Sequence, residues 1–136
     1  MRTCLAVAVI ALGGCSAAPE PARPDTGSRH AAGAFFTAIA VKDWAAAFNV
    51  IHPDSRQSLT MASFTTRAKS YRQALGFEPG QVRVGLCEEQ GDTANAHITI
   101  SDSRDSKKHR YREAIAVRRG PAEWGVIVPP NFGFKK

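Results

Sequence analysis

The sequence predicts an α+β fold in which helices precede an antiparallel sheet. Apolar residues recur at helical spacing between residues 30 and 76, and apolar and polar residues alternate after Gly80. Gly, Pro and Asp residues interrupt the alternating half at short intervals, which is typical of strands joined by tight turns. The 136 residues fit one domain with a short extension. One face of the sheet must therefore be buried against the helices.

The first two helices are expected before Pro53. Residues 30–41 place Phe35 and Ile39 on one helical face. Asp43 is a favourable N-cap for the second helix, which ends before Pro53 because a residue that precedes proline avoids helical angles. The apolar stripe of this second helix is formed by Trp44, Phe48 and Ile51.

Two more helices are expected before the strands begin. A short one starts at Asp54 or Ser55. Ser63 is a favourable N-cap for the longer one, and Gly76 suits its C-terminal end. The buried stripe of the longer helix is formed by Phe64, Ala68, Tyr71 and Leu75.

Four strands are expected in the second half, in a meander. Gln90-Gly91-Asp92 and Gly120-Pro121 are turn signals, and Pro129-Pro130 ends the last strand. A polar loop, residues 101–106, separates the second strand from the third. The alternating runs cover residues 82–87, 94–101, 111–118 and 124–128.

Residues 1–14 are typical of a signal peptide, with a basic start at Arg2 and an unbroken apolar run over residues 4–12. The next residues complete a short motif that resembles the lipobox of bacterial lipoproteins. In that family a diacylglycerol is attached to the cysteine, which becomes the new N-terminus. An ordinary secretory signal, cleaved after Ala17 or Ala18, is the alternative. The motif consists of Leu12, Gly13, Gly14 and Cys15.

Lipidation of Cys15 would make the membrane a partner through a lipid anchor, without a spanning helix. In the lipoproteins that this resembles, Asp after the cysteine retains the protein at the inner membrane, so Ser16 favours the outer membrane, facing the periplasm, of a cell with two membranes. Residues 15–29 are rich in Pro and Ala and are expected to form an extended tether, with the domain at residues 30–136. Cys87 is then either a buried apolar residue or a reactive or pairing thiol.

The chain also resembles a known fold family over about residues 30–130. Lys42-Asp43-Trp44 is followed by two alanines, Phe48 and a His52-Pro53 turn, and residues 124–128 resemble the family's closing strand. The resemblance is to the nuclear-transport-factor-two-like (SnoaL-like) cone fold, in particular to small bacterial lipoproteins of uncharacterised function. That superfamily includes isomerases, dehydratases, polyketide cyclases and many non-enzymes, so the fold alone does not determine an activity.

The resemblance implies a pocket in the cone between the helices and the sheet. Glu113 is of most interest, because the strand phase places its carboxylate among apolar neighbours, where it would be poised as a base. The alternatives are that a bulge turns Glu113 outward or that an Arg or Tyr satisfies it. No residues match the family's catalytic positions. The pocket candidates are Trp44, Phe48, Tyr71, Tyr111, Glu113 and Trp124.

The chain is basic, with 18 Lys and Arg against 12 Asp and Glu. Four of the arginines are expected on one face of the sheet, together with His97, where they would attract anionic lipids or envelope polymers. The alternative is a solvated face that discourages edge pairing. Nucleic acid is not an expected partner, because aromatic residues are not interleaved with the exposed basic residues. The anion-binding candidates are Arg83, Arg110, Arg112 and Arg118.

Neither a metal nor another cofactor is expected. The four histidines lack the spacing of metal ligands, and the sequence has no phosphate-binding loop and no nucleophile elbow. Three hypotheses remain. The first is a non-catalytic envelope lipoprotein that binds a small apolar ligand or a protein partner. The second is an adaptor for anionic envelope components, and the third is an isomerase or hydrolase that uses Glu113. A homodimer through the sheet is compatible with each.

Overall fold

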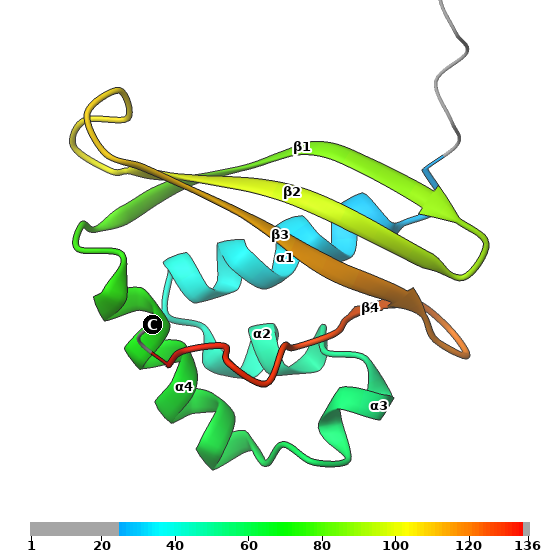
Figure 1. Ribbon diagram of the computed structural model, residues 1–136. Coiled ribbons are helices and arrows are strands. Elements are labelled where there is room, and N and C mark those ends of the chain that lie inside the picture. The colour runs from blue at the N-terminus through cyan, green and yellow to red at the C-terminus, as the bar shows by residue number, and fades with distance from the viewer. Residues whose placement is uncertain (1–24, 135–136) are drawn as a thin grey trace, which may run out of the picture.

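The computed structural model describes residues 25–134, and the expected signal peptide, lipobox and most of the tether lie outside them. Helices pack on one face of a curved antiparallel sheet, which confirms the α+β prediction (Figure 1). Within these residues no helix has the length and apolar character needed to cross a bilayer. The elements are α1 (Ser28–Ala40), α2 (Trp44–Asn49), α3 (Pro53–Arg56), α4 (Met61–Ala74), β1 (Pro79–Gln90), β2 (Thr93–Asp102), β3 (Arg110–Arg119) and β4 (Trp124–Val126).

The starts of the helices differ in detail from the expected ones. Helix α1 begins at Ser28, slightly before the expected boundary at His30. Helix α4 is capped by Thr60, whose hydroxyl accepts a hydrogen bond from the backbone N–H of Ser63, so Ser63 is not the cap. The reason is a hydrophobic staple: Leu59 before the cap and Phe64 within the first turn are both buried in the core, which fixes where the chain enters the helix.

The four strands follow one another in the order β1-β2-β3-β4, and all neighbours are antiparallel. Strand β4 is shorter than expected and ends at Val126. Val126 also pairs with Ile51 through a parallel bridge, and two residues later the Val128 N–H donates to the Ser55 hydroxyl of α3 rather than to β3. Among the described residues, only the last part of β3 pairs with β4, so the edge of β3 from Arg110 to Ala114 has no strand partner.

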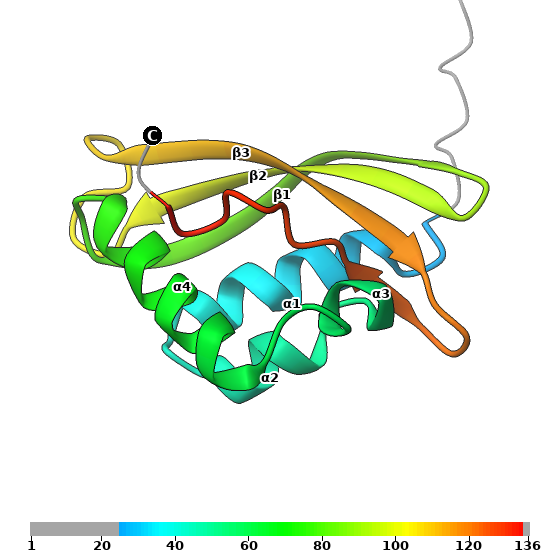
Figure 2. The ribbon, with the colours of Figure 1, turned by 60° about the horizontal axis from the view of Figure 1, so that its bottom comes forward.

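The core lies between the sheet and α1, which runs beneath the strands (Figure 2). Phe35 and Phe36 of α1 are fully buried and meet edge to face, with ring centroids 5.1 Å apart. Phe64 from α4 and Phe132 from the C-terminal segment stack in parallel at 6.3 Å. Aromatic side chains from three parts of the chain therefore fill the interior of the cone.

Candidate functional site

A cavity of about 790 Å³ lies where the edge of β3 has no partner strand. Its walls come from the C-terminal half of α4, from β3 and from residues 129–134. It is lined by Tyr71, Gln73, Ala74, Leu75, Tyr111, Arg112, Glu113, Ala114, Pro129, Asn131, Phe132, Gly133 and Phe134.

Local sequence explains how the central residues reach this cavity. Tyr71 lies on the apolar stripe of α4 and is 7% exposed. Glu113 and Tyr111 lie on the same inner face of β3 as the buried Ile115. They lie toward the end of β3 that has no partner strand, so Tyr111 is 41% exposed. The strand alternation therefore brings a carboxylate and a phenol to the mouth of the cone rather than into its core.

A short hydrogen bond joins Tyr71 to Glu113. The Tyr71 hydroxyl donates to Oε2 of Glu113 over 2.5 Å. Burial, followed by the charge and the hydrogen bond of Glu113, raises the pKa of Tyr71 far above its usual value. Burial and the same carboxylate also raise the pKa of Tyr111. Both phenols are therefore protonated at neutral pH. Of the alternatives considered for Glu113, the structure shows the one in which a tyrosine donates a hydrogen bond to its carboxylate.

The C-terminal segment forms one wall and is held by Arg67 of α4. The Arg67 guanidinium donates to the carbonyl of Phe132 over 2.9 Å, and to those of Pro129 and Pro130 over 2.9 and 2.8 Å. It also lies 5.1 Å from the ring centroid of Phe134. The wall carries Phe132, whose ring stacks on Tyr71 at 4.8 Å. One arginine thus fixes both the backbone and the aromatic lining of this wall.

The structure brings three of the six pocket candidates together: Tyr71, Tyr111 and Glu113. Phe48 packs against Phe64 at 5.7 Å, and Trp44 lines a separate groove. Trp124 is buried at the other end of the molecule. The predicted single cone pocket is thus divided, because the phenylalanines of the core occupy the space between these residues.

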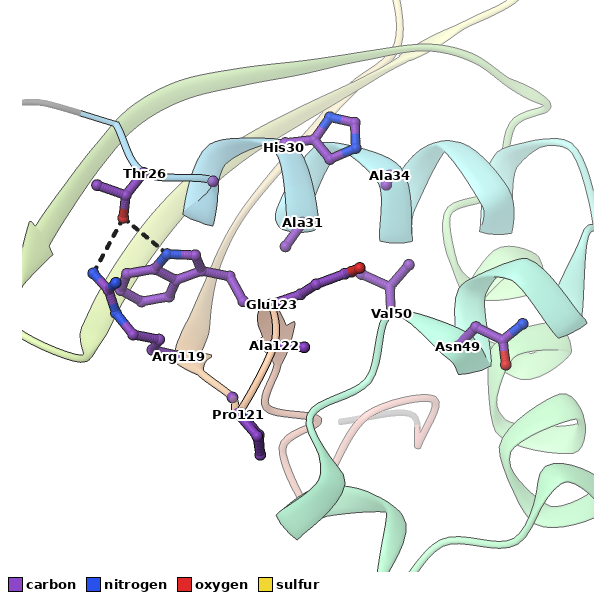
Figure 3. Close-up of a pocket in the computed structure, with 13 residues that line it drawn as sticks. Thr26, His30, Ala31, Ala34, Asn49, Val50, Arg119, Pro121, Ala122 and Glu123 are labelled. Carbon is purple, nitrogen blue, oxygen red and sulfur yellow. Dashed lines mark hydrogen bonds between the residues drawn. The ribbon is translucent and has the colours of Figure 1, made fainter.

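Trp124 belongs to a second cavity of about 520 Å³, beside the start of α1 (Figure 3). The hydroxyl of Thr26 accepts hydrogen bonds from the Trp124 indole over 2.9 Å and from Arg119 over 3.2 Å. It donates in turn to Glu89 over 2.8 Å. The Arg119 guanidinium lies 4.9 Å from the Trp124 ring centroid. These contacts tie the start of the domain to the sheet.

Glu89 also substitutes for a local cap of α1, because Gly27 at the N-cap has no side chain to do so. Its carboxylate accepts from the Ser28 hydroxyl over 2.7 Å and from the Thr26 backbone N–H over 2.8 Å. Burial opposes ionisation of Glu89, but the hydrogen bonds from Ser28 and Thr26 outweigh it and lower its pKa to about 2. Glu89 is not part of the cavity lining, and its contacts are structural.

The four candidate arginines do not form one patch. Arg83 and Arg112 lie on the outer face of the sheet, on either side of Thr99 in the strand register. Arg110 is one row further along and donates to the carbonyl of Ser106 over 2.6 Å. Arg118, at the other end of β3, pairs with Asp54 of α3 at 3.0 Å.

Sequence reasoning missed Phe132 and Glu89. The alternation of Phe132 and Phe134 after Pro129-Pro130 was a usable signal for a buried C-terminal segment. Glu89 carried no signal, because it caps a helix that is distant in sequence. Among residues 25–134, no group of three or more His, Cys, Asp or Glu is placed to hold a metal ion.

Comparisons with known proteins concern the fold. No family model and no curated protein matches the sequence. The structure resembles a nuclear-transport-factor-two-like (NTF2-like) transpeptidase from Campylobacter jejuni, with a TM-score of 0.53 and 9% identity over 72% of this chain and 94% of that one. Two further structures are less similar. A SEC-C-motif protein from Rhodopseudomonas palustris has a TM-score of 0.49 and 16% identity over 68% of this chain and 69% of that one. A designed protein with a curved sheet has a TM-score of 0.48 and 17% identity over 72% of this chain and 91% of that one. The chain thus has an NTF2-like fold, and at this identity the likeness extends to the fold alone.

Proposed function

We propose that this protein is a lipid-anchored protein of the bacterial cell envelope whose cavity beside β3 binds a small, largely apolar ligand without catalysis. The lipobox-like Leu12-Gly13-Gly14-Cys15 and the tether after it support the anchor. The observation that carries the binding function is the Tyr71–Glu113 bond of 2.5 Å at a cavity of about 790 Å³, a volume typical of small-molecule sites.

The same bond favours binding over acid–base catalysis. A catalytic pair of this kind needs a base that reaches a substrate proton and a separate donor aimed at a substrate oxygen. In this cavity the Tyr71 donor is directed at Glu113 itself. If a substrate is nevertheless turned over, Glu113→Gln should abolish turnover while the protein stays folded, and unchanged turnover would exclude Glu113 as the base.

The lining indicates the shape of the ligand. Tyr71, Phe132 and Phe134 offer aromatic surface, and Tyr111 contributes a hydroxyl at the exposed rim. Aromatic rings favour flat or chain-like apolar groups packed at van der Waals distance. A ligand with an apolar body and one polar end fits this lining best.

Native mass spectrometry tests the binding function. The chain from Asp25 onward, purified from a periplasm, should carry a discrete extra mass that leaves on mild activation. Phe132→Ala should lose that mass, because the substitution removes the aromatic wall on Tyr71. Leu86→Ala is the matched control, since Leu86 is an apolar residue 60% exposed on the opposite face. A protein that carries no extra mass when taken from the periplasm would contradict the proposal.

Lipid labelling tests the anchor. The full chain should incorporate labelled palmitate and sediment with membranes, and Cys15→Ser should do neither. Ser16→Asp should still be labelled but shift to the inner membrane of a diderm host. Labelling of the Cys15→Ser chain would contradict the assignment of the lipidated residue.

A second candidate is an adaptor for anionic envelope polymers. The row of Arg83, Thr99 and Arg112 across the outer face favours it, with Arg110 in the next row. Binding of this kind should weaken steeply with salt and with Arg110→Glu plus Arg112→Glu. Salt-independent binding would count against it.

A further inference from the structure

A groove of about 480 Å³ lies at the junction of α1 and α2, beside the end of α4. It is distinct from the proposed ligand cavity, with which it shares only Gln73. The residues that matter are Lys42, Trp44, Lys69, Arg72 and Glu78. Three cations, one carboxylate and an indole ring thus line the same groove.

Arg72 forms the inner wall, and its side chain is 12% exposed. Its Nη2 donates to the carbonyl of Ala40 over 3.2 Å and also contacts the carboxylate of Glu78. Its Nε is buried and has no hydrogen-bond partner among the described residues. Buried donors are normally satisfied, and a guanidinium can hold an anion through two parallel hydrogen bonds. Arg72 therefore makes fewer hydrogen bonds than it is able to make.

Lys42 stands in a conformation that suits glycine. Its φ is +64°, and it is the only non-glycine residue with a positive φ within residues 25–134. It follows α1 in the place where glycine commonly ends a helix, and the Asp43 N–H returns to the Ala38 carbonyl over 2.9 Å. Strain of this kind is concentrated at functional sites. A lysine in this place keeps a cation at the rim of the groove.

The ionised form of Glu78 is already stabilised by neighbouring cations. The hydrogen bond from Arg72 lowers the pKa of Glu78; burial opposes this, and the charges of Arg72, Lys42 and Arg104 lower it further. Its side chain is largely solvent-accessible, so an incoming anion can compete with it for Arg72. The Asp43 carboxylate, in contrast, is committed to the backbone N–H of Ala46 at the start of α2.

We infer that this groove binds an acidic sugar, with the sugar ring against Trp44 and its carboxylate or phosphate held by Lys42, Lys69 and Arg72. The volume suits one or two sugar rings. The half-buried indole offers an apolar face, and the three cations outnumber Glu78. The inference is independent of the proposed ligand cavity.

An NMR titration tests it with glucuronic acid, glucose 6-phosphate and glucose as probes. The chain has two tryptophans, so two indole N–H signals are expected. The Trp44 signal should shift with an acidic sugar and remain unchanged with glucose. Trp124 is the internal reference, because its indole is hydrogen-bonded to Thr26 at the other end of α1. A larger effect of glucuronic acid than of glucose 6-phosphate would identify a carboxylate site, and the reverse a phosphate site. A Trp44 signal that neither acid moves at millimolar concentration would overturn the inference.

Variants separate a built site from general attraction. Lys42→Gly and Lys69→Gln should each weaken binding about five-fold, as expected for one exposed charge contact. Glu78→Gln should strengthen it by removing the competing carboxylate. Arg29→Gln removes one charge at the start of α1 and should leave the affinity unchanged. Equal losses in Arg29→Gln and Lys69→Gln would mean non-specific attraction only. Lys42→Gly should keep or raise the melting temperature, so weaker binding by this variant cannot be attributed to unfolding. Phe132→Ala, in the other cavity, should leave the sugar titration unchanged.

Discussion

The hydroxyl of Tyr71 determines how the ligand cavity responds to alkali. Because the pKa of Tyr71 is raised in the folded chain, its protonated form stabilises the fold at every pH below about 10, the ordinary value for tyrosine. Above that pH the unfolded chain loses the proton first, so this stability declines as the pH rises. The free energy of unfolding in urea should therefore fall between pH 8 and pH 11.

Tyr71→Phe should remove much of that fall, because phenylalanine has no proton to lose. At pH 8 the same variant should be less stable by about 1.5–3 kcal/mol, the value of a hydrogen bond to a charged group. Absorbance at 295 nm should also show that neither tyrosine of the native protein ionises at its ordinary pH. An equal alkaline loss in wild type and Tyr71→Phe would contradict the role given to this hydroxyl.

Glu89 gives the opposite pH dependence. Its pKa is lowered to about 2 in the folded chain, so its contribution is complete above the ordinary glutamate value and is lost as the pH falls toward 2. Glu89→Gln should destabilise the protein by about 1 kcal/mol at pH 7, as expected for a helix cap. The difference from wild type should shrink between pH 5 and pH 2. Glu123→Gln, at an exposed position, is the control for the loss of one carboxylate and should cost less stability at pH 7 than Glu89→Gln.

At the scale of elements, the junction of α1 and α2 is strained at Lys42. Lys42→Gly should raise the free energy of unfolding by up to about 1 kcal/mol, because glycine adopts a positive φ without steric cost. Val41→Gly is the control: its φ is −90°, so glycine relieves nothing there and should destabilise the protein. Urea denaturation of both variants measures the difference. A loss in both would mean that Lys42 is not strained.

The C-terminal segment is fitted closely to α4 at Gly133. A Cβ there would lie 2.2 Å from the Arg67 carbonyl oxygen, and φ is +78°. Gly133→Ala should cost about 2–3 kcal/mol and abolish ligand retention in native mass spectrometry. Gly76→Ala is the matched control, because Gly76 has a similar φ of +74° but no atom within 4 Å of the added Cβ. It should cost about 1 kcal/mol and keep the ligand.

Periodicity predicted the existence and order of the elements, and tertiary contacts set their ends. The helical stripe of α4 was recognisable, but its start was displaced to Thr60 by the burial of Leu59 and Phe64. The alternation of the last strand extends to residue 128, yet β4 ends at Val126, and the Val128 N–H donates to the Ser55 hydroxyl instead of to β3. Such contacts join distant parts of the chain and leave no mark on the local pattern.

The candidate site was predictable to the same extent. Strand phase was enough to bring Glu113 and Tyr111 to the inner face, and helical phase did the same for Tyr71. The width of the cone was not predictable, because it depends on how Phe36 and Phe132 fill it. Trp44, Phe48 and Trp124 are consequently separated from the cavity.

At the scale of the whole molecule, the open edge of β3 affects association between copies. Arg110 and Arg112 lie at this edge, and charged residues discourage strand pairing between molecules. Arg112→Val should raise the average mass seen by light scattering at high concentration. Ala114→Val adds the same side chain without removing a charge and should raise it less. Equal behaviour of the two variants would contradict this role of Arg112.

Helix α1 sets the distance between two ends of the molecule. Its thirteen residues span about 20 Å. They separate Thr26, near the start of the described chain, from the groove that Trp44 lines. If the tether joins a lipidated Cys15, the groove lies at the pole opposite the attachment point. Glycan strands in the surrounding compartment would then reach the exposed Lys42 and Lys69 at least as easily as the headgroups of the bilayer would.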